Sequence, residues 1–182
     1  YIESSPTNDA LVYLTADDIS LYLDEIAADG WPFREIAFTG GEPFLNPKII
    51  EILRRPLAAG FEVLVLTNAM RPMMRKRVQE GLLELHALYG DRLTLRISLD
   101  HYAAAAHDAE RGRGSFDVSL QGMRWLRDNG FRMAVAGRRD WAESEAEGRR
   151  GFAQLFEAEG FRIDAQDPAM TVLFPEMDAS VD

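Results

Sequence analysis

The sequence predicts an α/β fold built on a parallel β-sheet, and three observations support this prediction. Short apolar segments alternate with longer segments of helical periodicity, which is the pattern of βαβ units. The segment Phe61–Leu66 is almost continuously apolar, as expected of a strand covered on both faces. Four expected helices end in glycine, followed by an aromatic residue and a strand: Gly30-Trp31, Gly60-Phe61, Gly130-Phe131 and Gly160-Phe161. No linker interrupts the pattern, so we expect one domain over residues 1–182.

The composition limits the classes of function. The 182 residues are 47% hydrophobic and 27% charged, which is typical of a globular protein with a substantial core. No apolar run approaches the roughly 18–20 residues that span a bilayer, so we expect a cytoplasmic protein without membrane contact. The net charge of −10 disfavours nucleic acid as a partner. The absence of cysteine excludes disulfides and thiolate metal ligands within these residues.

The first helix and its neighbours follow from caps and apolar spacing. After a polar, irregular segment over residues 1–14, Thr15 and Asp18 resemble a capping box that opens a helix, and Gly30 ends it. The apolar stripe of this helix should comprise Ile19, Leu23, Ile26 and Ala27. A short strand over residues 35–39 should follow.

The second helix should begin after this strand. Asn46 suits its N-cap and Pro47 its first position, while Pro56 should kink or shorten it. Its expected core residues are Ile49, Ile50 and Leu53. After the strand at 61–66, a third helix is predicted from about Met73 to Tyr89, with Val78, Leu82, Leu85 and Leu88 buried.

The second half of the chain continues the alternation. We expect a strand over 93–99, and then a long loop that carries His101, His107, Asp108, Arg111 and Arg113. Ser115 should cap a fourth helix that Gly130 ends. A strand over 131–136 should run out at Gly137-Arg138, and a helix over 142–159 and a strand over 170–174 should follow.

The segment from Arg34 to Phe44 contains the clearest candidate for a ligand loop. Gly40 and Gly41 at the end of a strand leave the backbone bare, and Pro43 fixes the shape of the loop. Backbone carbonyls together with the Glu42 carboxylate suit the ammonium group of a small zwitterionic ligand. The alternative interpretation is a tight strand-to-helix turn.

Polar residues also follow the other strands: Thr67 and Asn68, Ser98 and Asp100, and Arg138. Ligands of parallel α/β barrels bind at the carboxyl ends of the strands. Each residue has a structural alternative, because Thr67 and Asn68 could cap a helix, Ser98 could bond a loop, and Arg138 could be a surface charge. Their joint occurrence favours a site.

The segment Thr39-Gly40-Gly41-Glu42-Pro43 resembles the Gly-Gly-Glu-Pro motif of the radical S-adenosylmethionine (radical SAM) enzymes. The strand ends at 65–69 and 95–100 and the segment at 111–117 agree with that family, in the same order. The resemblance covers nearly the whole chain. It implies a partial (βα)6 TIM-like barrel with a parallel sheet, of which the first strand is absent from this chain.

One feature departs from the family. Its Cys-x3-Cys-x2-Cys loop, which holds a 4Fe–4S cluster, is not found in this cysteine-free chain. In many members an aromatic residue follows the third cysteine, and this chain opens on Tyr1. We therefore expect a core domain truncated before Tyr1 and also at its C-terminus, with the cluster ligands upstream.

The resemblance also implies roles for residues. Gly40, Gly41 and Glu42 would receive the methionyl ammonium of S-adenosylmethionine, with Pro43 fixing the loop. Ribose hydroxyls and the methionyl carboxylate would be contacted by Thr67, Asn68, Ser98 and Asp100. Arg111 or Arg138 would supply positive charge to that carboxylate, and the backbone of residues 172–174 would face the adenine.

The implied function is generation of a 5′-deoxyadenosyl radical that abstracts hydrogen from a substrate, with S-adenosylmethionine and a 4Fe–4S cluster as cofactors. The implied partners are a small-molecule or peptide substrate and an electron donor such as a ferredoxin or flavodoxin. The alternative is a non-catalytic scaffold that binds a ligand or protein. His101, His107 and Asp108 share one loop and could form a metal site, but such histidines are more often packed or solvated, so we expect none.

Overall fold

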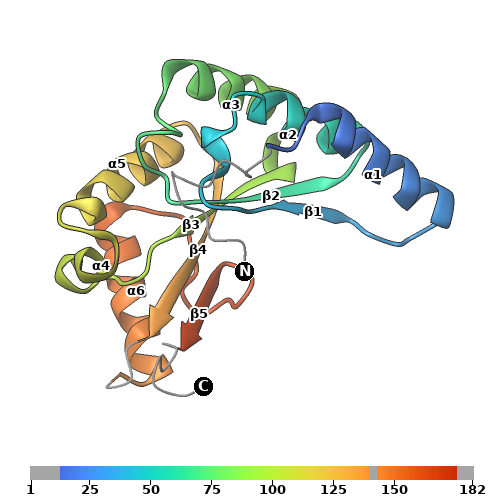
Figure 1. The fold of residues 1–182 in the computed structure, drawn as a ribbon. Helices are drawn as coiled ribbons and strands as arrows, with labels where there is room; N and C mark the ends of the chain where they lie inside the picture. The colour runs from blue at the N-terminus through green and yellow to red at the C-terminus, as the bar shows by residue number, and fades with distance from the viewer. Residues whose placement is uncertain (1–12, 140–142, 176–182) are drawn as a thin grey trace, which may run out of the picture. The chain divides into compact units, whose positions relative to one another are not determined.

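The computed structural model describes residues 13–139 and 143–175, and it confirms the predicted α/β fold (Figure 1). The described residues form a parallel sheet of five strands in the order β1-β2-β3-β4-β5. The strands are β1 (Glu35–Phe38), β2 (Glu62–Thr67), β3 (Leu93–Ser98), β4 (Arg132–Arg139) and β5 (Thr171–Pro175). The helices are α1 (Ala16–Asp29), α2 (Ile49–Ala58), α3 (Lys76–Tyr89), α4 (Ala104–Arg111), α5 (Ser115–Asp128) and α6 (Glu145–Glu159).

The chain divides into two compact units. The first unit comprises Tyr1–Thr67 and Pro72–Thr94, and the second comprises Asn68–Arg71 and Leu95–Asp182. The interpretation of Tyr1 as a residue that follows a cluster loop lies outside the described residues. Across the described ranges, no helix is both long enough and apolar enough to cross a membrane.

In the first unit, α1, α2 and α3 lie along one side of a parallel pair of strands (Figure 1). Strand β1 pairs with β2 so that Glu35 lies opposite Glu62 and Phe38 lies opposite Val65. The core between helices and strands is fully buried at Leu53, Leu57, Val63, Val65, Leu82 and Leu85. The predicted capping box of Thr15 and Asp18 is present, and Gly30 ends α1 in the left-handed conformation.

The starts of α2 and α3 were predicted too early. Residues Pro43–Leu45 form a 3-10 turn, and the Asn46 side chain accepts a hydrogen bond from the Lys48 N–H, so α2 begins at Ile49 instead of Pro47. We predicted that Pro56 would kink or shorten α2. Pro56 lies within the helix, which ends two residues later at Ala58. Helix α3 begins at Lys76 instead of Met73.

Burial in the first unit also differs from the helical pattern. On α1 only Ile19 of the predicted stripe is buried; Leu23 and Ile26 are half-buried and Ala27 is exposed. The reason is that α1 packs against α2 and extends beyond it at the edge of the unit. In α2, Ile50 is half-buried and Ile52 takes its place in the core, while Leu88 of α3 is 60% exposed.

In the second unit, β4 pairs with β5 in parallel. Val135 lies opposite Thr171, and Arg138 lies opposite Phe174. Gly137 and Arg138 therefore belong to β4 itself, although they were predicted to follow it. Phe152 and Phe156 bury the inner face of α6, which begins at Glu145 after an unpredicted capping box of Ser144 and Glu147.

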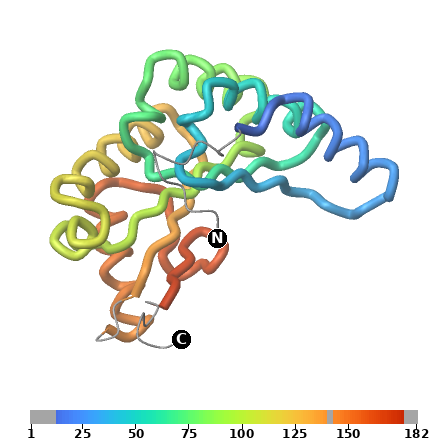
Figure 2. The backbone as a smooth tube through the Cα atoms, viewed as in Figure 1, coloured from blue at the N-terminus to red at the C-terminus, as the bar shows by residue number. Residues whose placement is uncertain are grey.

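The predicted long loop after β3 contains a helix, α4, which leads directly into α5 (Figure 2). The three alanines at its start have the highest helix propensity of any residue, and this outweighs the absence of an amphipathic repeat over so short a segment. The capping residue of α5 is also not the predicted one. Ser115 is the first residue of α5, and Asp108 of α4 accepts hydrogen bonds from the Gly114 and Phe116 N–H groups at 2.6 and 2.9 Å.

Candidate functional site

The glycine loop, Gly40-Gly41-Glu42-Pro43, follows β1 in the first unit and is held in shape by the Glu42 side chain. The Glu42 residue is 9% exposed, and its carboxylate accepts a hydrogen bond from the Phe44 N–H at 3.2 Å. Thr67 at the end of β2 donates its hydroxyl to the same carboxylate, at 2.9 Å to Oε1 and 3.1 Å to Oε2. The loop is thereby tied to the end of the neighbouring strand.

The backbone of the loop is open at Gly40. Its φ of 147° lies in a region that side chains rarely adopt, and no described atom lies within 4 Å of the position that a Cβ would take. Because Glu42 is turned toward Thr67 and Phe44, the open face of the loop consists of backbone. Backbone carbonyls beside a buried carboxylate form an environment that favours a cation such as an ammonium group.

Asn68 belongs to the second unit, where it shapes a tight turn. Its side-chain oxygen accepts a hydrogen bond from the Met70 N–H at 2.9 Å, and its backbone carbonyl accepts one from the Ser119 hydroxyl at 3.0 Å. The next residue, Ala69, is fully buried and has a φ of 57°. Gly122 of α5 leaves room for this turn, because a Cβ there would lie 1.9 Å from the Ala69 carbonyl oxygen.

Asp100 is the centre of the second unit's charged network and follows β3. The residue is 5% exposed, and its carboxylate accepts two hydrogen bonds from Arg111, at 2.5 Å from Nε and 3.0 Å from Nη2. Such a two-pronged contact is the strongest form of a guanidinium–carboxylate pair. The Asp100 carbonyl also accepts a hydrogen bond from the Arg138 N–H of β4 at 2.7 Å, which joins the end of β3 to the next strand.

Arg138 is the second guanidinium beside Asp100, and it is the more available of the two. Its Nε lies 3.6 Å from Asp100 Oδ1 and its Nη1 lies 3.5 Å from Glu110, while half of its side chain is exposed. Both contacts are longer than those of Arg111, whose fork is already occupied by Asp100. An incoming carboxylate would therefore find donors on Arg138 that make only these two long contacts with described residues. Ser98, two residues before Asp100, is half-buried, and its hydroxyl makes no hydrogen bond to any described residue.

His107 holds the backbone of Asp100 through a hydrogen bond. The side chain is fully buried on α4, and its Nδ1 accepts a hydrogen bond from the Asp100 N–H at 3.1 Å. Burial lowers the pKa of His107, against an opposing effect of the Asp100 charge, so the ring is neutral at physiological pH. One short helix thus supplies the partners of both the backbone and the carboxylate of Asp100, through His107 and Arg111.

A second polar cluster in this unit was missed by sequence reasoning. Tyr102 donates its hydroxyl to Glu143 Oε1 at 2.5 Å, and the other Glu143 oxygen lies 3.8 Å from His101 Nε2. The hydrogen bond to Glu143 raises the pKa of Tyr102. No sequence signal pairs these residues, because 41 positions separate Tyr102 from Glu143.

Two histidines of this unit accept hydrogen bonds from backbone N–H groups. His101 Nδ1 accepts a hydrogen bond from the Ala103 N–H at 2.9 Å, as His107 Nδ1 does from Asp100. Within the part of the chain that the structure describes, no three His, Asp or Glu side chains are grouped so that they could hold a metal ion. The 182 residues also offer no thiolate to iron, so they do not fit a 4Fe–4S cluster.

The profile of the radical SAM superfamily matches residues 2–138, which include the glycine loop, Thr67, Asp100 and Arg138. The chain therefore belongs to the radical SAM superfamily, whose members use S-adenosylmethionine and a 4Fe–4S cluster.

Two curated relatives agree with this assignment. The chain is 36% identical over 137 residues to the antilisterial bacteriocin subtilosin biosynthesis protein AlbA of Bacillus subtilis, covering 75% of this chain and 28% of AlbA. It is 34% identical over 119 residues to the AdoMet-dependent heme synthase of Methanosarcina barkeri, covering 65% of this chain and 32% of that protein. The chain thus spans about a third of the length of these relatives.

Solved structures show the same fold. Streptococcus suis SuiB bound to S-adenosylmethionine matches with a TM-score of 0.64 at 13% identity, covering 93% of this chain and 35% of SuiB. TYW1 with a lysine-pyruvate adduct bound matches with a TM-score of 0.55 at 16% identity, covering 92% of this chain and 52% of TYW1.

Proposed function

We propose that this chain is the S-adenosylmethionine-binding part of a radical SAM enzyme. The observation that carries the proposal is the match to the superfamily over residues 2–138, within which the glycine loop leaves open space at the Cβ position of Gly40. When bound, the cofactors of this family supply a 5′-deoxyadenosyl radical that abstracts hydrogen from a substrate. We take these 182 residues as part of one core domain. Ligands for a cluster would come from residues outside them.

The residues of each unit would have their own roles in the proposed binding of S-adenosylmethionine. The open backbone at Gly40 and Gly41 would receive the ammonium group, with Glu42 and Pro43 fixing the loop. Thr67, Asn68, Ser98 and Asp100 would orient the ribose and carboxylate. Of the two arginines, Arg138 suits the methionyl carboxylate better, because Arg111 is held by both oxygens of Asp100.

The relatives name two products, a bacteriocin and heme, so a peptide and a small molecule are both substrate classes to be tested in the complete protein. An electron donor such as a ferredoxin or flavodoxin, and a cytoplasmic location, complete the proposal. A non-catalytic scaffold is the alternative that the experiment below separates from it.

The test is binding of S-adenosylmethionine to the full-length protein by isothermal titration calorimetry, with Gly40→Ala as the key variant. A methyl group on the open face should weaken binding at least about tenfold, since backbone approach to the ligand is lost. Gly60→Ala is the matched control, because Gly60 also has positive φ and open space around its Cβ position but lies outside the loop.

Cleavage of S-adenosylmethionine after anaerobic reconstitution with iron and sulfide then separates an enzyme from a scaffold. Binding without cleavage would favour the scaffold. If the wild type and Gly40→Ala bind S-adenosylmethionine equally well, the glycine loop is not part of the binding site.

A further inference from the structure

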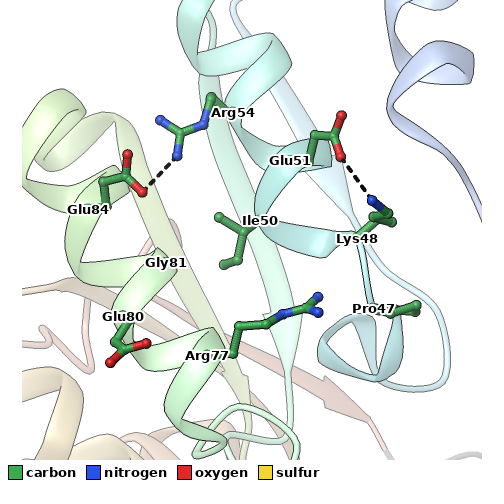
Figure 3. Close-up of a pocket in the computed structure, with 9 residues that line it drawn as sticks. All are labelled: Pro47, Lys48, Ile50, Glu51, Arg54, Arg77, Glu80, Gly81 and Glu84. Atoms are coloured by element: carbon green, nitrogen blue, oxygen red, sulfur yellow. Dashed lines mark ion pairs between the residues drawn. The ribbon is translucent and has the colours of Figure 1, made fainter.

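The groove between α2 and α3 in the first unit, of about 430 Å³, is lined by charges that balance one another (Figure 3). Its charged residues are three cations and three carboxylates: Lys48, Arg54, Arg77, Glu51, Glu80 and Glu84. Arg54 pairs with Glu84 at 3.0 Å, and Lys48 lies 3.8 Å from Glu51. Without an excess of either charge, the groove does not favour a charged ligand. In the second unit, by contrast, an ionisable side chain is fully buried.

That side chain is His107. Of the eight residues of α4, all of which the structure describes, only His107 is buried. An apolar side chain would pack at such a position without losing hydration, whereas a buried imidazole costs free energy unless both of its nitrogens are hydrogen-bonded. Only one of them is: Nδ1 accepts the Asp100 N–H at 3.1 Å, and Nε2 has no hydrogen-bond partner among the described residues. A feature that costs stability in this way is expected where function requires it.

The hydrogen bond to Asp100 determines where the ring of His107 carries its proton. Because Nδ1 is an acceptor, the proton of the neutral ring is on Nε2. A second proton can then be added only at Nδ1, where it takes the place of the Asp100 N–H. The charged ring is a donor at both nitrogens, so protonation of His107 breaks its hydrogen bond to the Asp100 backbone.

The helix that carries His107 holds Asp100 at two points. His107 and Arg111 are one turn apart on the same face of α4, and they bond the backbone and the carboxylate of Asp100 respectively. Asp108 fixes α4 by accepting hydrogen bonds from two N–H groups at the start of α5. The Phe116 ring of α5 packs edge-on against His107, with the ring centroids 5.7 Å apart. The imidazole is therefore confined on a fixed helix, and its hydrogen bond determines where the Asp100 backbone lies.

We propose that His107 is a positioning residue for S-adenosylmethionine: its neutral ring fixes the backbone of Asp100, and its protonation releases Asp100 and weakens binding. This inference rests on the proposed function, in which Asp100 orients the ribose and carboxylate of the ligand. The Asp100 carbonyl also accepts the Arg138 N–H at 2.7 Å. A displaced Asp100 therefore disturbs Arg138 as well, the arginine that suits the methionyl carboxylate.

The surroundings of His107 set the pH range of this effect. The charged and titratable groups that act on the ring are Asp100 after β3, His101 before α4, and Asp108 and Arg111 of α4. Burial lowers the pKa of His107, and the Asp100 charge is the main opposing influence. The ring is therefore neutral at pH 7.5. Binding should be at full strength above about pH 6.5, the ordinary pKa of histidine, and weaken as the pH falls through the lower folded-state pKa.

The test measures the dissociation constant of S-adenosylmethionine with the full-length protein, by isothermal titration calorimetry in steps from pH 7.5 to pH 5.0. His107→Leu removes the acceptor and should bind at least about fivefold more weakly at pH 7.5, the factor that corresponds to one lost hydrogen bond. In His107→Asn, the Oδ1 atom can accept the Asp100 N–H but takes up no proton. This variant should recover most of the wild-type affinity and lose the weakening at acid pH. A merely structural histidine would not confer a pH dependence of binding that asparagine abolishes.

The matched control is His101→Asn, which removes the neighbouring titratable ring. His101 directly follows Asp100, and its Nδ1 accepts the Ala103 N–H at 2.9 Å, so asparagine can again supply the acceptor. This variant should keep the wild-type pH dependence of binding. The pair of asparagine variants thus separates the protonation of His107 from that of a histidine beside the same carboxylate.

Three results would overturn the proposal while the proposed function stands: wild-type affinity in His107→Leu, a wild-type affinity that does not change with pH, and a pH dependence that persists in His107→Asn or disappears in His101→Asn. If His107→Leu does not fold, the two asparagine variants still decide. Absence of binding by the wild type at pH 7.5 would contradict the proposed function and the positioning role together. The two failures are thus distinguished by the wild type alone.

Discussion

The glycine loop of the first unit and the Asp100 network of the second are built in different ways. The carboxylate of the loop, Glu42, bonds one residue two positions away and one at the end of the next strand. The carboxylate of the network, Asp100, bonds a guanidinium from α4 and lies beside another from β4. The first is a carboxylate anchored by hydrogen bonds from a backbone N–H and a hydroxyl, and the second is a part-buried ion pair.

This difference determines how each region should respond to substitution. When the Thr67 hydroxyl is lost, the Glu42 carboxylate still accepts a hydrogen bond from the Phe44 N–H. A carboxylate lost from the network leaves the Arg111 guanidinium, 28% exposed, without its partner. The loop should therefore tolerate loss of a partner better than the network.

The largest effect is expected from Asp100→Asn. The amide keeps the shape of the side chain but removes the charge that balances Arg111, and loss of one partner from such a pair costs about 3 kcal/mol. Urea denaturation of the wild type and the variant measures this difference in the free energy of unfolding. Asp24→Asn, at an exposed position of α1, is the control and should change it by less than about 0.5 kcal/mol. A similarly small change for Asp100→Asn would contradict the ranking of the two regions.

The glycine loop could be predicted from the sequence because its defining residues are adjacent in the chain. Two glycines and a proline constrain the backbone wherever they stand, and the carboxylate lies between them in the chain. The participation of Thr67 followed from its place at a strand end. The use of Glu42 to bond Thr67 was not predicted, because the register between β1 and β2 decides that contact.

A smaller effect is expected from Thr67→Val, which keeps the shape of the side chain and removes the hydroxyl. The buried Glu42 carboxylate then loses a donor, at a cost of about 1.5 kcal/mol. The same urea measurement applies, and the exposed Thr39→Val serves as the control. A loss as large as that of Asp100→Asn would contradict the expectation that the loop tolerates loss of a partner better than the network.

The Asp100 network was predicted only as a set of separate residues. Asp100, Arg111 and Arg138 were each placed in the site. The sequence left open which of the two arginines would pair with Asp100 and which would be available to a ligand. It depends on α4, which was predicted as a loop because an eight-residue helix has too few turns to show an apolar period. The packing role of His107 was equally hidden, since burial is a property of the folded neighbourhood.

The smallest effect is expected from the pH dependence that His107 confers on the network. Its folded-state pKa lies below the usual value of about 6.5, so the unfolded chain binds a proton first as the pH falls. The stability that neutral His107 contributes is fully present above pH 6.5 and decreases as the pH falls toward the folded pKa. The groups that act on its charge are Asp100, Arg111, Asp108 and His101, of which the two carboxylates oppose the shift.

The variant His107→Asn tests this dependence, because its Oδ1 can accept the Asp100 N–H in place of Nδ1 but does not take up a proton. Urea midpoints measured at pH 7.5 and pH 5.0 should differ less in the variant than in the wild type. The readout is the difference between the two pH values, so a general loss of packing in the variant does not affect it. An unchanged difference would mean that the Asp100 network, like the glycine loop, does not depend on the protonation of a buried histidine.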